Sequence, residues 1–319
     1  SLYIGIDINS SLLKQAEDIF SGNEKMIFIQ EDFSKGLPVK ESQPPFDIYF
    51  TSYGTFAHNT DEVTINILAD IAQHVKDYGL IICDWLGRYS YEWQSLWDAS
   101  LQEEMFMDYK ISYIFPEEER INAEIESFPL RLLCKDEVMK IIKEASRKAG
   151  VKISVGALFD RSIFVGRHMD TGDYNCHCPK MRRAVSSLFE WNLRTDLQTL
   201  LLDYIPKQGF DHLNSFFETY SLSWNALIKY AIQLLSNYDS NTQKVKDAPK
   251  APSYYPDFLK ELLTIMYQVI EGAGRVPWGD PRANIIEPFL GYALRSLEMN
   301  MQNGNGYGHG LVGVFEVKK

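Results

Sequence analysis

The sequence predicts an α/β fold in which an open parallel sheet is interrupted, before its last strand, by a large block of helices. Three observations lead to this prediction. Apolar strand-like runs alternate with helical periodicity over residues 1–85, helical periodicity alone continues through residues 174–303, and a β-rich run at residues 310–317 closes the chain. We therefore expect a sheet-bearing core at residues 1–173, a helical lid at residues 174–303, and a strand within residues 304–319 that returns to the core.

Each apolar run of the first 85 residues ends near a polar side chain. The runs at residues 2–7, 26–29, 46–51 and 79–83 lead to Asp7, Asp32, Ser52 and Asp84, respectively. Helical spacing of apolar residues follows the first run and returns over residues 61–76. Because the ligands of open α/β sheets bind outside the carboxyl ends of the strands, these four ends predict a binding site.

The rest of the chain predicts a cover and a lid for that sheet. Residues 86–128 are irregular and aromatic, and we interpret them as a segment that covers the strand ends, with Trp93 and Trp97 in the core. A helix capped by Asp136 is expected to run to Ala149, before Gly150 ends it, and strand-like runs follow at residues 151–158 and 162–166. In the lid, helices are expected near residues 180–190, 194–203, 211–236, 256–271 and 282–302, with a polar loop at residues 239–253.

Composition and charge argue against a nucleic-acid-binding, a disulfide-rich and a membrane-spanning protein. The net charge of −11 argues against a nucleic-acid backbone as the main partner, since that contact requires a dense basic face. The 4 cysteines are too few for a disulfide framework, and Cys176-His177-Cys178 lacks the spacing of a zinc site. Apolar runs stay shorter than the ~18 residues of a membrane span, and no signal peptide precedes the first strand, so we expect a reducing cytoplasm.

Two of the strand ends carry residues suited to a nucleoside. A carboxylate at a strand end, here Asp7, can accept hydrogen bonds from both ribose hydroxyls. A carboxylate followed by a ring, here Asp32 and Phe33, can accept from the exocyclic amine of adenine while the ring packs on the base. Each acid alone is better explained as a solvated strand-end side chain, and Asp7 alone would serve an NAD enzyme equally well. Together, in this order, they predict nucleoside binding.

Four segments carry a family resemblance over about residues 2–87. YIGIDINSSLLKQAEDIF, MIFIQEDF, FDIYFTSYGTFAHNTDE and GLIICDWLG resemble successive motifs of class I S-adenosylmethionine-dependent methyltransferases, whose sheet is Rossmann-like. The resemblance implies that Asp7 binds the ribose and that Asp32 and Phe33 bind the adenine, and Ile8 is a further candidate for cofactor binding. It also implies that Thr51, Ser52 and Tyr53 line the methyl-donor side.

The sequence departs from that family in one respect. The family's first strand and its glycine-rich loop, which hold the methionine part of S-adenosylmethionine, are missing from this stretch. The glycine-dense tract at residues 304–310 follows a predicted helix and precedes a strand, the reverse of the order that a cofactor-cradling loop requires. We therefore expect an excised or incompletely represented domain, with the loop upstream of residue 1. An NAD enzyme stays the alternative, although Glu31-Asp32-Phe33 favours the methyl donor.

A second polar cluster, residues 160–171, lies where the chain leaves the predicted sheet for the lid. In an extended backbone His168 and Asp170 point to the same side, and with a third ligand they would form a facial metal triad. The candidates for the third ligand are Gln302, His309 and Gln268. The alternative, which spacing alone favours, is that this segment only ties the lid to the sheet through hydrogen bonds and ion pairs.

A second resemblance extends over nearly the whole chain. DRSIFVGRHMDT, RTDLQTLLLDYIP, SWNALIKYA and ANIIEPFLGYALRSLE resemble the C-methyltransferase domains of cyanobacterial polyketide synthase loading modules, of the saxitoxin and apratoxin starter-unit type. This implies methylation of a malonyl group on an acyl carrier protein, beside the other domains of a loading module. It also implies a mononuclear iron or manganese ion, for which the ligand candidates are His168, Asp170 and Gln302.

Such a metal would stabilise the malonyl enolate, and a base would remove the α proton. The candidates for that base are His309, His58 and Tyr53. Since carrier proteins are usually acidic, docking on this acidic chain requires a basic patch, which Arg182 and Arg183 could supply. Two alternatives stay open, a metal-independent O- or N-methyltransferase of a small molecule and an inactive scaffold domain.

Overall fold

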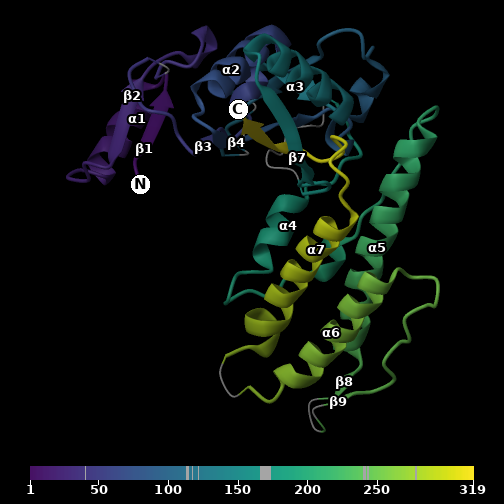
Figure 1. Cartoon of the computed structure of the whole chain (residues 1–319). Helices are drawn as coiled ribbons and strands as arrows, with labels where there is room; N and C mark the ends of the chain where they lie inside the picture. The colour runs from purple at the N-terminus through teal and green to yellow at the C-terminus, as the bar shows by residue number, and fades with distance from the viewer. Residues whose placement is uncertain are drawn as a thin grey trace.

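A mixed sheet of six strands forms the centre of the molecule (Figure 1). The computed structural model describes residues 1–319 except 40, 113–114, 117, 121, 166–173, 240–241, 243 and 277–278. The strands of the sheet are β3 (Ile48–Phe50), β4 (Tyr78–Gly87), β5 (Phe106–Lys110), β6 (Ser127–Leu133), β7 (Lys152–Arg161) and β10 (Gly310–Lys318).

The last strand gives the sheet its mixed character. β3 and β6 pair in parallel with the two halves of one edge of β4, and β5 pairs antiparallel with β6. On the other edge of β4, β10 runs antiparallel to both β4 and β7 and separates them. The α/β prediction is thus confirmed and the return of the final segment to the sheet is observed, whereas an all-parallel sheet is wrong.

The first strands form a small sheet of their own. β1 (Tyr3–Asp7) and β2 (Met26–Gln30) pair in parallel, and α1 (Ser10–Ile19), capped by the Asn9 side chain, connects them. In residues 1–31, all of which the structure describes, Leu13 is the only buried side chain. This unit lies at one end of the molecule, beside β3 but without strand pairing to it (Figure 1).

Helices cover the central sheet on one side. α2 (Asp61–His74) and α3 (Lys135–Ala149) pack side by side there, and their buried apolar residues, such as Leu68 and Ile141, meet those of the strands. Burying each such side chain contributes about 1.5–3 kcal/mol. α3 begins directly after Cys134, whose N–H donates to the Glu137 carboxylate (2.9 Å), so the predicted Asp136 cap is wrong by two residues. Gly150 ends the helix as predicted, at φ +65°.

The lid helices extend from the other side of the sheet (Figure 1). They are α4 (Met181–Ser187), α5 (Asp211–Ser236), α6 (Asp257–Ala273) and α7 (Glu287–Met301), and a π-helix (Arg282–Ile286) leads into α7. The helix expected at residues 194–203 shrinks to a 3₁₀ turn, Leu197–Leu200, because the Asn225 amide accepts from the Leu202 N–H and donates to the Leu202 carbonyl. The loop at residues 239–253 includes part of a short hairpin, β8 (Tyr238–Asp239) and β9 (Lys244–Val245). That residues 174–303 fold as a separate unit stays a prediction.

The aromatic segment connects the sheet to the lid. It is less irregular than expected, because it contains β5 and 3₁₀ turns at Tyr91–Asp98. Trp93 and Trp97 are buried, and their indole N–H groups donate to the carbonyls of Gly87 (2.9 Å) and Ser90 (3.0 Å). Trp97 also stacks on Phe217 of α5, with ring centroids 5.6 Å apart. Within the described part of the chain, none of the helices has the length and apolar character that crossing a bilayer requires.

Candidate functional site

Asp84 joins three strands from within β4, which continues to Gly87, so the strand end predicted at residue 83 is wrong. The Asp84 side chain is only 5% exposed, and it accepts from the backbone N–H of Gly54 (2.7 Å) and from Nη2 of Arg161 (2.9 Å). Gly54 follows β3, and Arg161 ends β7. To reach Asp84, the Arg161 side chain crosses β10 at Gly310, where a Cβ atom would lie 3.1 Å from its guanidinium. We call Asp84, Gly54 and Arg161 the Asp84 cluster.

The loop after β3 is strained where it meets this cluster. Tyr53 and Gly54 both adopt left-handed backbone conformations, with φ of +62° and +71°. For a residue with a side chain this costs about 1–2 kcal/mol, and such strain concentrates at binding and catalytic sites. Tyr53 is 78% exposed. The Ser52 carbonyl accepts from the Thr55 hydroxyl (2.6 Å), which fixes the turn.

Thr51 offers an unused polar atom beside that loop. Its N–H donates to the Ile82 carbonyl of β4 (2.8 Å), which holds the residue against the sheet. Its hydroxyl is buried and has no hydrogen-bond partner among the described residues. Because buried hydroxyls are nearly always paired, an orphaned one at a strand end fits a site that a polar ligand completes.

Asp7 and Asp32 lie at the carboxyl ends of the parallel strands β1 and β2. Asp7 Oδ1 accepts from the Asn9 N–H (2.7 Å), and the adjacent Ile8 side chain is exposed. Asp32 accepts from both the hydroxyl (2.6 Å) and the N–H (3.0 Å) of Ser34. These hydrogen bonds lower the pKa of Asp32 below its ordinary value, so its carboxylate is ionised at neutral pH.

Phe33 connects this small sheet to the loop after β3. Its ring lies 6.2 Å from that of Phe56, which belongs to the 3₁₀ turn Thr55–His58. The next residues also contact α2, where the Leu37 N–H donates to Asp70 (3.2 Å). The structure therefore brings Asp32 and Phe33 toward the loop of Tyr53, although β1 and β2 belong to a separate sheet.

The three candidate bases occupy different environments. His309 is 3% exposed, and its Nδ1 lies 2.5 Å from Oε2 of the buried Glu92. His58 is exposed and its ring lies tilted against that of Phe128, with ring centroids 5.1 Å apart. Partial desolvation lowers the pKa of His58 below its ordinary value, which favours the neutral imidazole. Tyr53 is exposed as well.

Asp160 shapes the glycine-dense tract that leads to His309. Its carboxylate accepts from the N–H groups of Asn305 (3.0 Å), Gly306 (2.8 Å) and Tyr307 (2.8 Å). Gly306 fits because a Cβ atom there would lie 2.6 Å from the Leu133 carbonyl oxygen, and its φ is +86°. Burial raises the pKa of Asp160. The tract thus wraps around a buried acid of the protein itself, consistent with its rejection as a cofactor loop.

Of the three metal-ligand candidates, only Gln302 belongs to the described part of the chain. His168 and Asp170 lie outside the described residues. The amide oxygen of Gln302 accepts from the Asp160 N–H (3.0 Å), which gives this side chain a role in joining α7 to β7. In the part of the chain that the structure describes, no group of three His, Cys, Asp or Glu side chains is arranged to hold a metal ion.

Two residues of the site were missed by sequence reasoning. Arg161 was seen only as part of a polar cluster, because its partner Asp84 lies 77 positions away and β10 intervenes. Glu92 was assigned to an irregular covering segment, although it pairs with His309 across 217 positions. The available signal was an acid next to a predicted core residue, Trp93, which is unusual for a buried segment.

Comparisons with known proteins find distant structural similarity alone. No family model and no curated protein sequence matches the chain. An S-adenosylmethionine-dependent methyltransferase from Clostridium acetobutylicum ATCC 824 matches with a TM-score of 0.35 and 14% identity, over 50% of this chain and 68% of that chain. The glycopeptide N-methyltransferase MtfA matches with a TM-score of 0.34 and 15% identity, over 49% and 65%. MtfA complexed with S-adenosyl-L-homocysteine gives 0.35 and 15%, over 51% and 68%. At these scores no functional residue is transferred from those proteins.

Proposed function

We propose that the protein is an S-adenosylmethionine-dependent methyltransferase that binds the nucleoside of its methyl donor at the carboxyl ends of β1, β2 and β3. One observation carries the proposal: Phe33 packs on Phe56, which brings the acid-aromatic pair Asp32-Phe33 to the strained loop of Tyr53. Ligands of open α/β sheets bind at this edge.

Each residue of the proposed site has a chemical role. Asp7 would accept from the ribose hydroxyls, and the ionised Asp32 from the exocyclic amine of adenine, against the Phe33 ring. The orphaned Thr51 hydroxyl would pair with a polar group of the methyl donor. When bound, S-adenosylmethionine supplies an electrophilic methyl group. The strained loop and the Asp84 cluster hold this edge in one geometry before the donor arrives.

Calorimetric titration with S-adenosylhomocysteine and with NAD tests the proposal. We expect binding of S-adenosylhomocysteine, weakened about tenfold or more by Asp32→Ala or Asp7→Ala, since each removes a charge-assisted hydrogen bond. Asp18→Ala, an exposed acid on α1, is the matched control and should bind normally. Binding of NAD alone would instead establish the rival dinucleotide enzyme. Failure to bind either would favour an inactive scaffold.

The finer proposal is that the methyl acceptor is a carbon of a malonyl group on an acyl carrier protein. The resemblance of the segments named above supports it, and so does the exposed pair Arg182 and Arg183 on α4, which could face an acidic carrier. We expect Arg182→Glu with Arg183→Glu to slow turnover of the malonyl carrier protein but not of a malonyl-pantetheine mimic. Equal loss on both substrates would refute this docking surface.

His58 is our preferred base for proton removal. It is exposed, whereas His309 is buried against Glu92, and its lowered pKa keeps it neutral and able to accept a proton near pH 7. The His58→Ala variant should then lose kcat while S-adenosylhomocysteine affinity is unchanged. If kcat is unchanged as well, His58 is not the base.

The finer proposal includes a metal-assisted route in which His168 and Asp170 would be metal ligands. Because His168 and Asp170 lie outside the described residues, we assign no step to iron or manganese. Metal analysis of the purified protein, with His168→Ala beside it, distinguishes the routes. Iron or manganese lost in the variant supports the metal-assisted enzyme, and activity unaffected by chelator supports the metal-independent O- or N-methyltransferase.

A further inference from the structure

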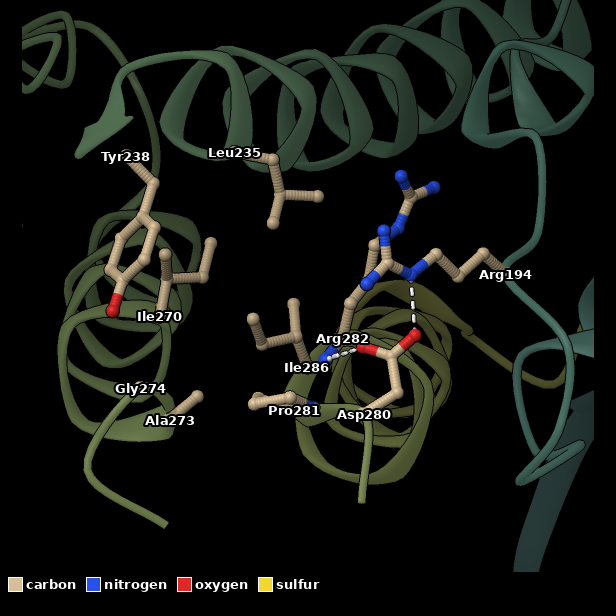
Figure 2. Close-up of a pocket in the computed structure, with 10 residues that line it drawn as sticks. All are labelled: Arg194, Leu235, Tyr238, Ile270, Ala273, Gly274, Asp280, Pro281, Arg282 and Ile286. Carbon is tan, nitrogen blue, oxygen red and sulfur yellow. Dashed lines mark hydrogen bonds and ion pairs between the residues drawn. The ribbon is translucent and has the colours of Figure 1, made fainter. Parts of the chain in front are cut away.

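A cavity of about 260 Å³ lies at the end of the lid that points away from the sheet (Figures 1 and 2). It opens between the end of α5, the end of α6 and the π-helix. Leu235, Ile270 and Ile286 give it apolar walls, and the ring of Tyr238 closes one side (Figure 2). The Tyr238 hydroxyl lies over Gly274, where any Cβ atom would clash with it, so that glycine lets the ring take this position.

Two arginines form the polar end of the cavity. Arg194 and Arg282 both line the cavity, and Figure 2 draws their side chains on the same side of it. Arg194 binds Asp280 through Nε, while Arg282 donates from Nε to Glu287 (2.7 Å) and from Nη2 to the Thr195 carbonyl (2.6 Å). Hydrogen bonds within the described residues therefore leave both terminal nitrogens of Arg194 and one of Arg282 unused.

This arrangement defines the chemistry of a ligand. Asp280 and Glu287 each pair with one guanidinium through its Nε, and the remaining N–H groups can still donate to an anion. The fork geometry of the two guanidiniums matches the oxygens of a carboxylate or a phosphate, and the carboxylates on their Nε sides fix the orientation of both forks. A π-helix at the rim is a further feature that is frequent at functional sites.

We propose that the lid cavity binds an amphipathic anion, an apolar chain that ends in a carboxylate or phosphate. The chain would lie between Leu235, Ile270 and Ile286, and the head group would bind the unused nitrogens of Arg194 and Arg282. The proposed nucleoside site at the carboxyl ends of β1, β2 and β3 lies away from this cavity (Figure 1). Binding of the anion in the cavity therefore does not depend on the proposed methyl transfer.

Calorimetric titration of the whole protein with octanoate, octyl phosphate and octanol tests the proposal. We expect one saturable site for at least one of the anions, and the preferred anion identifies the head group. Octanol, which has the same chain without the charge, should bind at least about tenfold more weakly. The proposal would be overturned if neither anion shows saturable binding up to millimolar concentration. It would also be overturned if octanol binds as tightly as the preferred anion.

Arginine substitutions test whether the anion binds in this cavity. Arg194 is 61% exposed as a side chain, so Arg194→Gln should keep the fold and weaken the preferred anion about tenfold or more. Arg194→Lys keeps the charge but loses the fork, and should also weaken binding. Arg275→Gln removes an exposed charge close in the chain but outside the cavity lining, and should leave affinity within about twofold. Equal losses in Arg275→Gln and Arg194→Gln would mean that binding is a general charge effect, contrary to the proposal.

Discussion

At the scale of single residues, two glycines distinguish two costs of a glycine-to-alanine substitution. One is the cost of a left-handed backbone, and the other is the cost of a steric clash of the added Cβ atom. Gly306 and Gly209 have nearly the same backbone, with φ of +86° and +85°, but only Gly306 is crowded. A Cβ atom at Gly306 meets the Leu133 carbonyl oxygen at 2.6 Å, while at Gly209 the described structure leaves the space open.

We therefore expect Gly209→Ala to lower the free energy of unfolding by about 1–2 kcal/mol, the cost of the left-handed backbone alone. Gly306→Ala should lower it by about 1–3 kcal/mol more, because the backbone must also move to relieve the contact. Urea denaturation of both variants measures the difference. Equal losses would show that the contact with Leu133 is relieved without cost.

A second residue-scale prediction concerns the pH dependence of stability. Because desolvation beside Phe128 lowers the pKa of His58, the unfolded chain takes up this proton first as pH falls below about 6.5. The free energy of unfolding therefore decreases as pH falls from about 6.5 through the folded-state pKa, and the contribution of His58 is fully present at higher pH. Denaturation between pH 5 and 7.5 should show a shallower slope for His58→Gln than for the wild type.

The titration of the His58 ring by NMR provides the direct control. Phe128→Ala exposes the ring and should raise its pKa toward the ordinary value. Unchanged titration in that variant, or parallel stability curves for wild type and His58→Gln, would exclude desolvation as the cause.

At the scale of elements, one glutamate joins α7 to the end of β7. The Glu298 carboxylate accepts from the N–H groups of Ser162 (3.1 Å) and Ile163 (2.9 Å), where the chain leaves the sheet and Ser162 takes a φ of +59°. Glu298→Ala leaves two part-buried donors without this acceptor and should lower the free energy of unfolding by about 1–3 kcal/mol. Glu298→Gln keeps an acceptor and should cost less.

The exposed Glu261 of α6 gives the matched control, since Glu261→Ala should change stability by less than about 0.5 kcal/mol. Denaturation curves of the three variants measure these differences in the free energy of unfolding. A loss in Glu298→Ala no larger than in Glu261→Ala would show that water replaces the carboxylate at this junction.

Elements could be predicted from sequence where local signals decide them, and not where distant segments do. The α5 range follows from its apolar spacing, and the end of α3 from Gly150. The 3₁₀ turn at residues 197–200 could not be foreseen, because the amide of Asn225, on another element, replaces helical hydrogen bonds at Leu202. In the same way Asp84 was predicted at a strand end, whereas β4 continues to Gly87 and the pairing of Asp84 with Arg161 depends on where β10 enters the sheet.

At the scale of the whole molecule, stability is unevenly distributed between the two sheets. β4, β7 and β10 belong to a core shared with α2 and α3, and their buried residues include Ile81, Trp85 and Phe315. The unit of β1, α1 and β2 buries Leu13 alone among its side chains, all of which the structure describes. Since local opening is easiest where little apolar surface is buried, this unit should open well below the free energy of global unfolding.

Hydrogen exchange detected by mass spectrometry tests this expectation and connects it to function. Peptides covering residues 3–30 should exchange at least about tenfold faster than peptides from β4 and β10, and comparable protection would contradict the difference in burial. If Asp7 and Asp32 bind a nucleoside, saturating S-adenosylhomocysteine should slow exchange in residues 3–34, because a ligand that binds only the closed unit opposes its opening. Asp32→Ala should abolish that slowing while leaving the fast exchange of the free protein unchanged. The opening of the small sheet and the binding of the methyl donor would then be thermodynamically linked, because the donor binds only the closed unit.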